Sequence, residues 1–175
     1  KNYLSYKAED LSTWRNFICI EGILWTYSLT GNRSLLGLAE DIWKIGNFEV
    51  NEKACLSEEP LDMHGVPFCE SVKIPMLLYA YTGKDEYLKA ALSAETTMEK
   101  FDMLPDGVPS SAENLAGLDV THSHETCDVS DFTWSMGYYL MTTGEAGWAD
   151  RIERAVFNAG PGAITKDFKA LQYFS

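Results

Sequence analysis

The chain has 175 residues, of which 46% are hydrophobic, and this is enough apolar material for one domain with a buried core. Its 26 acidic and 14 basic side chains give a net charge of −12, which argues against nucleic-acid backbones and anionic membranes as partners. No apolar run approaches the ~18 residues of a membrane span. Because the chain starts without Met and stops inside an apolar segment, we expect residues 1–175 to be one piece of a single, longer domain.

The first predicted hairpin contains an aromatic-rich apolar helix that ends at Thr30-Gly31 and an amphipathic helix over 35–45. Glycine suits the position after a helix because it adopts the left-handed conformation without strain. The connection that follows, over 47–65, is long and rich in carboxylates. Long connections without structure of their own are uncommon and often functional. His64, near its end, is a candidate for binding a ligand hydroxyl; the alternative is a hydrogen bond to a helix end.

Two further hairpins repeat the pattern. Their first helices end at Gly83 and Gly144, and their second helices are predicted over 86–101 and 146–158. Lys73-Ile74-Pro75 must kink or restart the first helix of the second hairpin, because proline lacks the N–H that continues a helix. Separations of 52 and 61 residues between the glycines indicate stacked helical hairpins. The expected fold is all-α, with αα-hairpin repeats forming about half of an (α/α)6 barrel or toroid and no internal domain boundary.

The second long connection, over 104–124, contains Glu113 among small residues. A carboxyl group in a partly dry pocket has a raised pKa and can act as a general acid, whereas a solvated loop glutamate has no such role. Glu125 follows twelve positions later, and glycoside hydrolysis commonly uses two convergent acidic groups. His122 and His124 end this connection and, with His64, are candidate substrate-binding residues.

The segment 122–128 packs two imidazoles, two carboxylates and a thiol just before an apolar helix. A helix start favours negative charge, so Cys127 is expected to ionise easily. Because the first residue is not yet helical, Glu125 and Cys127 could converge on one metal ion. The alternative is an ordinary first turn in which Cys127 packs as a small hydrophobe. Further along this helix, Trp134 and Tyr138 could face a sugar, although their spacing suits a buried core.

These motifs resemble the bacterial β-L-arabinofuranosidase family, glycoside hydrolase family 127 and its uncharacterised relatives. The resemblance runs from about His64 to the end of the chain, through the blocks 64–66, 73–75, 111–117, 125–127 and 148–158. It implies an (α/α)6-barrel hydrolase in which zinc is held by a Glu-x-Cys pair and by later cysteines, one of which is the nucleophile. By the same resemblance, Glu125 and Cys127 match the zinc pair, and Glu113 matches the acid/base.

The later cysteines of the family have no counterpart here, because Cys19, Cys55 and Cys69 match neither their order nor their context. The cysteine spacing also shows no disulfide framework. The expected protein is therefore a fragment of a retaining glycoside hydrolase that acts on arabinose-containing plant-type glycans. We expect this fragment alone to be inactive and to self-associate. The alternatives are another α/α-toroid carbohydrate enzyme without catalytic zinc, such as an epimerase, uronyl hydrolase or lyase, and a non-catalytic helical-repeat module that binds a glycan or a protein.

Overall fold

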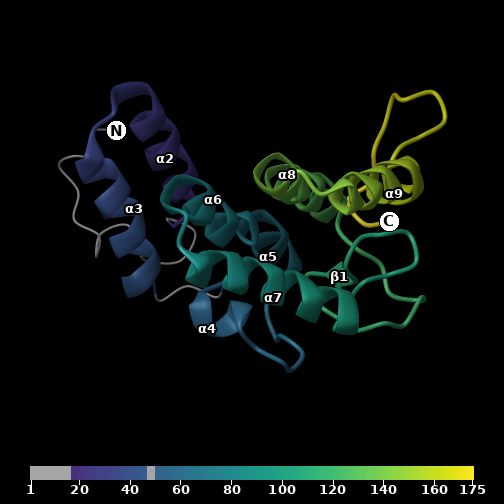
Figure 1. Cartoon of the computed structure of the whole chain (residues 1–175). Coiled ribbons are helices and arrows are strands. Elements are labelled where there is room, and N and C mark those ends of the chain that lie inside the picture. The colour runs from purple at the N-terminus through teal and green to yellow at the C-terminus, as the bar shows by residue number, and fades with distance from the viewer. Residues whose placement is uncertain (1–16, 47–49) are drawn as a thin grey trace.

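The computed structural model describes residues 17–46 and 50–175. Its helices are α2 (Cys19–Thr30), α3 (Arg33–Ile45), α4 (Glu52–Cys55), α5 (Gly65–Ser71), α6 (Lys73–Thr82), α7 (Asp85–Phe101), α8 (Thr126–Thr143) and α9 (Ala146–Gly162). A short antiparallel hairpin joins β1 (Ser111–Ala112) to β2 (Asn114–Leu115). The structure confirms the all-α fold and the three predicted hairpins, α2–α3, α6–α7 and α8–α9, which follow one another across the molecule (Figure 1).

The first helix of each hairpin ends in the same way. Gly31, Gly83 and Gly144 all have positive φ, at 65°, 68° and 72°, as the sequence predicts. Before each glycine is a threonine whose hydroxyl donates to the carbonyl four residues earlier. The same hydroxyl accepts the N–H two residues later, on the far side of the turn. Threonine and glycine together therefore close one helix and start its partner.

The two long connections contain structure that the sequence did not predict. Residues 50–65 include the short helix α4, whereas the start of this connection, residues 47–49, lies outside the described residues. The second connection carries the β1–β2 hairpin. The predicted break at Lys73-Ile74-Pro75 is confirmed, since α5 ends at Ser71 and α6 begins at Lys73. Pro75 lies in the first turn of α6, where a missing N–H costs little.

Helix α6 packs against both α2 and α8, and the core lies between these helices and α7. Tyr139 of α8 is fully buried, and its hydroxyl lies 3.1 Å from the carbonyl oxygen of Val72 and 2.8 Å from that of Ala91. This side chain links α8 to the α5–α6 junction and to α7. In the part of the chain that the structure describes, no helix combines the length and apolarity needed to cross a membrane.

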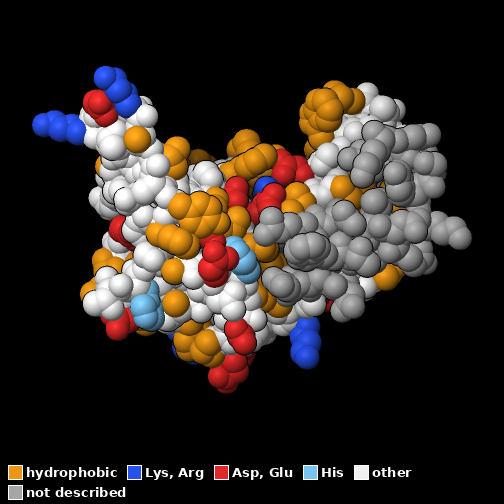
Figure 2. Space-filling view, turned by 180° about the vertical axis from the view of Figure 1, so that it is seen from behind, with side chains coloured by type: hydrophobic (Ala, Val, Ile, Leu, Met, Phe, Trp, Pro, Cys, Tyr) orange, Lys and Arg blue, Asp and Glu red, His pale blue; other side chains and the backbone are white. Residues whose placement is uncertain are grey.

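Helices α2, α6 and α8 also line an open groove of about 690 Å³. Its walls are formed by Ile18, Cys19, Glu21, Gly22, Trp25, Leu77, Tyr81, Tyr138 and Met141. Figure 2 shows this hollow, with hydrophobic side chains around a small group of charged ones. Trp25 and Met141 are 62% and 73% exposed. Large apolar side chains gathered on one face mark an interaction surface.

We predict that the isolated 175-residue chain self-associates through this groove. Met141→Lys should shift the population toward monomer, because a charge in the contact must be desolvated. Phe157→Lys is the matched control, since Phe157 is 71% exposed but lies on α9, outside the groove. Light scattering after size-exclusion chromatography measures the mass. A monomeric wild-type chain, or an equal effect of both substitutions, would contradict the prediction.

Candidate functional site

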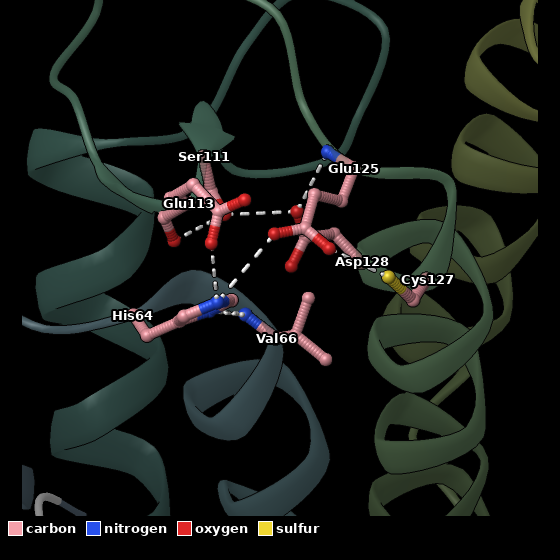
Figure 3. Close-up of polar contacts among 7 residues, drawn as sticks. All are labelled: His64, Val66, Ser111, Glu113, Glu125, Cys127 and Asp128. Atoms are coloured by element: carbon pink, nitrogen blue, oxygen red, sulfur yellow. Dashed lines mark hydrogen bonds and ion pairs between the residues drawn. The ribbon is translucent and has the colours of Figure 1, made fainter. Parts of the chain in front are cut away.

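Three segments far apart in sequence converge at one end of the hairpin stack. His64 is the N-cap of α5, Glu113 lies at the turn between β1 and β2, and Glu125 is the N-cap of α8. His64 Nε2 lies 3.0 Å from Glu113 Oε2 and 3.6 Å from Glu125 Oε1 (Figure 3). Cys127 Sγ lies 2.9 Å from the other oxygen of Glu125. The structure therefore brings together four of the residues that the sequence analysis singled out.

The backbone of Glu113 is strained. Its φ is 90°, a value that L-residues other than glycine rarely adopt and that costs about 1–3 kcal/mol. The Glu113 carbonyl accepts the N–H of Gly65 at 2.8 Å, and the N–H of Leu115 donates to Met63 at 3.0 Å. These bonds fasten the β1–β2 turn to the start of α5. These backbone bonds hold Glu113 in its strained conformation, with its side chain in contact with His64.

A close contact beneath the cluster holds the three segments together. The hydroxyl of Ser111 donates to Asp128 Oδ2 at 2.9 Å, and the same oxygen accepts the N–H of Glu125 at 3.0 Å. A Cβ atom on Gly65 would lie only 1.8 Å from Ser111 Oγ, so only glycine allows α5 to approach this closely. Burial raises the pKa of Asp128 to about 7. The sequence analysis did not assign Asp128 and Ser111; the acidic residue three positions after the N-cap was the available signal.

The ring of His64 is oriented by the helix that it caps. Its Nδ1 accepts the N–H of Val66 at 3.3 Å, so in the neutral ring the proton lies on Nε2. Nε2–H then donates to the carboxylate of Glu113. Of the two possibilities for His64, the structure shows the hydrogen bond to a helix end, and the other ring nitrogen faces Glu113. In this tautomer His64 is a hydrogen-bond partner of Glu113 rather than a metal ligand.

Glu125 and Cys127 form the buried side of the cluster. The Glu125 side chain is 1% exposed, and its Oε1 has no hydrogen-bond partner among the described residues. Burial, and then the hydrogen bond to Glu125, raise the pKa of Cys127 to about 12. The expectation of an easily ionised thiol was wrong, because desolvation and the neighbouring carboxylate outweigh the helix start. A cation bound by both side chains would neutralise the buried carboxylate and favour the thiolate, and carboxylate and thiolate are both zinc ligands.

The other two histidines lie outside this cluster. His122 is exposed, and its N–H donates to the carbonyl of Asp119. His124 is 3% exposed, with Nε2 at 2.7 Å from Asp106 Oδ2 and Nδ1 at 3.0 Å from Ser175 Oγ. Both ring nitrogens of His124 are thus occupied by protein groups. The structure gives His124 a role in packing the start of α8 against its neighbours, and it gives neither histidine a place beside Glu113.

No protein-family model and no curated protein matches the chain, whereas solved structures do. A β-L-arabinofuranosidase of family GH127 from Geobacillus stearothermophilus T6 has 19% identity and a TM-score of 0.72, covering 93% of this chain and 31% of that chain. A sugar epimerase from a ruminal bacterium has 15% identity and a TM-score of 0.67, and the match covers 91% of this chain and 47% of that chain. An inactive α-1,6-mannanase variant of family GH76 from Salegentibacter sp. HEL1_6, in complex with α-1,6-mannotetrose, has 16% identity and a TM-score of 0.67, covering 88% and 49%.

These similarities establish the fold. The chain has the architecture of α/α-toroid carbohydrate-active enzymes and spans about a third to a half of the length of the chains that it matches. The same toroid fold carries hydrolases and an epimerase, so the fold alone does not select a reaction.

We predict that Gly65→Ala lowers the free energy of unfolding by about 1–3 kcal/mol, because its Cβ would collide with Ser111 and force the site apart. Gly37→Ala is the matched control. No atom lies within 4 Å of a Cβ at Gly37, in the middle of α3, so alanine there should stabilise the chain by about 0.5–1 kcal/mol. Urea unfolding of both variants measures the difference. Equal effects would show that the close contact does not constrain the fold.

Proposed function

We propose that this chain is part of a retaining glycoside hydrolase of the GH127 type that acts on arabinose-containing plant-type glycans. The observation that carries the proposal is the convergence of Glu113, Glu125 and Cys127 at one end of a half toroid. These are the residues to which the sequence resemblance assigns the acid/base and the zinc pair. The α/α-toroid fold, which the chain shares with the GH127 enzyme, agrees with this assignment.

Glu113 is the proposed general acid and base. Its side chain is 59% exposed rather than in the partly dry pocket that the sequence analysis required for a raised pKa, so the proposal rests on its accessibility to a substrate oxygen and on its contact with His64 Nε2 at 3.0 Å. When Glu113 gives its proton to the departing alcohol, Nε2–H of His64 is placed to stabilise the resulting carboxylate. The nearest oxygens of Glu113 and Glu125 lie within 4.8 Å of each other.

Glu125 and Cys127 are the proposed zinc ligands. The buried carboxylate of Glu125, whose Oε1 has no hydrogen bond among the described residues, and the thiol of Cys127 beside its Oε2 fit the ion's preference for oxygen and sulfur. When bound, zinc would lower the pKa of a coordinated thiol and so supply a thiolate at neutral pH. The resemblance assigns the nucleophile to a cysteine that this chain does not contain, so we propose that the isolated chain does not hydrolyse glycosides.

A second ligand set also lies in the cluster. The ligand atoms of His64, Glu113 and Glu125 all lie within 4.8 Å of one another, so they too could hold a divalent ion. The hydrogen bond from Val66 to Nδ1 of His64 argues against this set, because it leaves the proton on Nε2. The alternative functions, an epimerase, uronyl hydrolase or lyase, or a non-catalytic binding module, are compatible with the fold but leave the pair formed by buried Glu125 and partly exposed Cys127 without a role.

We predict that the full-length protein binds about one zinc ion and that Cys127→Ser removes most of it, because a thiolate ligand is lost. His64→Asn should retain the metal if Cys127 rather than His64 is a ligand, and asparagine can still cap α5. Cys19→Ser is a matched control at a partly exposed cysteine on α2, away from the cluster. Elemental analysis of the four proteins decides between the two ligand sets. Equal zinc in wild type and Cys127→Ser would refute the assignment.

We predict that Glu113→Gln lowers turnover of the full-length enzyme by roughly 10²–10⁴-fold while fold and zinc content stay intact, because an amide cannot transfer the proton. A substrate with an activated leaving group should partly restore the first step, since it needs less protonation. Asp119→Asn is the control, an exposed acidic residue on the same connection. Turnover is measured with aryl β-L-arabinofuranosides of different leaving-group pKa. Unchanged rates on the poorest leaving group would remove Glu113 from the mechanism.

A further inference from the structure

A charged layer crosses the α2–α6–α8 groove below the candidate site. Glu21, Lys73 and Trp134 each lie ten residues before the glycine that ends their helix, at 31, 83 and 144. Because these helices end in the same way and pack side by side, the three side chains lie at one height. Lys73 Nζ is 3.2 Å from Glu21 Oε2 and 4.1 Å from the centre of the Trp134 ring. Three repeats thus place three different side chains in direct contact.

This layer combines a fixed carboxylate, Glu21, which lines the groove, with an exposed aromatic side chain, Trp134. The side chain of Lys73 is 1% exposed, whereas that of Glu21 is 20% exposed and Trp134 is 53% exposed. The hydroxyl of Tyr138 donates to Glu21 Oε1 at 2.6 Å, so each oxygen of this carboxylate has one fixed partner. A carboxylate accepts about four hydrogen bonds, which leaves capacity for a ligand. The ammonium lies beneath the indole and holds it, so a ligand meets the ring and not the cation.

The layer and the candidate site lie on the same side of α8. Cys127, Asp131, Trp134 and Tyr138 follow one another at spacings of four, three and four residues, which places them on one helix face. Cys127 and Trp134 are seven residues apart, or about 10 Å along the axis. Helical side chains tilt toward the N-terminus, so the indole of Trp134 reaches back toward Cys127. A sugar bound along this face of α8 could therefore contact Glu113 and Glu125 at one end and the indole of Trp134 at the other.

The chemistry of the layer suits a neutral sugar. An exposed indole offers an apolar face to the C–H side of a sugar ring, and the fixed carboxylate accepts its hydroxyl protons. Glu21 belongs to the layer and Glu113 and Glu125 to the candidate site, and the nearby cation, Lys73, is covered by Trp134. Three carboxylates against one covered ammonium leave a net negative charge, which selects against an anionic sugar. Because Lys73 and Tyr138 fix the carboxylate and the indole before binding, little ordering remains for the ligand to induce.

We propose that Trp134 and Glu21 form the floor of a pocket for a neutral sugar, about two helical turns below Cys127. This inference rests on the proposed glycosidase function, and it adds two substrate-contacting residues and a preference for uncharged sugars. The polar layer with Glu21 is distinct from the apolar part of the groove, which contains Trp25 and Met141.

The test is calorimetric titration of methyl β-L-arabinofuranoside into full-length protein in the Glu113→Gln background, where binding is not followed by turnover. Trp134→Ala should weaken binding at least tenfold, and Trp134→Phe, which keeps an aromatic face, should restore most of it. Trp25→Ala is the matched control at a tryptophan of similar exposure deeper in the groove, and it should change the affinity less than twofold. Methyl β-D-glucuronide, the anionic probe, should bind at least tenfold more weakly than the neutral glycoside.

The inference is overturned if Trp134→Ala and Trp25→Ala bind the neutral glycoside equally well, or if the glucuronide binds as tightly. A fully active Glu113→Gln enzyme would instead refute the proposed function, and sugar binding that still depends on Trp134 would then leave the pocket floor standing. If no neutral glycoside binds at all, both the function and the pocket floor fail.

Discussion

The contact between Gly65 and Ser111 is the constraint on which the candidate site depends. It allows the start of α5 to lie directly against β1, and Ser111 continues the connection to Asp128 at the start of α8. His64 is one residue from Gly65, Glu113 is two residues from Ser111, and Glu125 is three residues from Asp128. Their side chains converge because their backbones are pinned together underneath. The Cβ of a side chain at position 65 would lie only 1.8 Å from Ser111 Oγ, so the two segments would have to move apart.

The candidate site lies at the end of the hairpin stack where helices α5 and α8 begin. His64 and Glu125 are N-cap residues, so both lie where a helix begins and backbone N–H groups are unpaired. At α8 this environment favours a carboxylate, yet burial leaves one oxygen of Glu125 without a hydrogen bond within the described structure. A buried, partly unsatisfied carboxylate beside a protonated thiol is costly unless a cation completes it. The proposed zinc ion would offset this cost by binding the carboxylate of Glu125 and the thiolate of Cys127.

Local rules were sufficient for most of the fold. The Thr-Gly ends of the first helices and the apolar spacing predicted all three hairpins, because both signals act within a few residues. Glu113, Glu125 and Cys127 were also accessible to sequence reasoning, through their residue types and the family resemblance. The placement of the histidines was not, because it depends on contacts between distant segments: His64 faces Glu113 across the β1–β2 turn, whereas His124 is occupied by Asp106 and Ser175. The thiol of Cys127 was misjudged for the same reason, since the helix start is a local effect and burial is a tertiary one.

The central claim is that Glu125 and Cys127 hold a metal at one end of this half toroid. Anomalous diffraction at the zinc edge, from crystals of the full-length protein grown with one equivalent of zinc, tests it most directly. The account predicts one strong peak with a sulfur ligand from Cys127 at about 2.3 Å and an oxygen ligand from Glu125 at about 2.0–2.2 Å. A peak bonded to His64 and Glu113 but not to Cys127, or zinc bound only elsewhere on the protein, would contradict it.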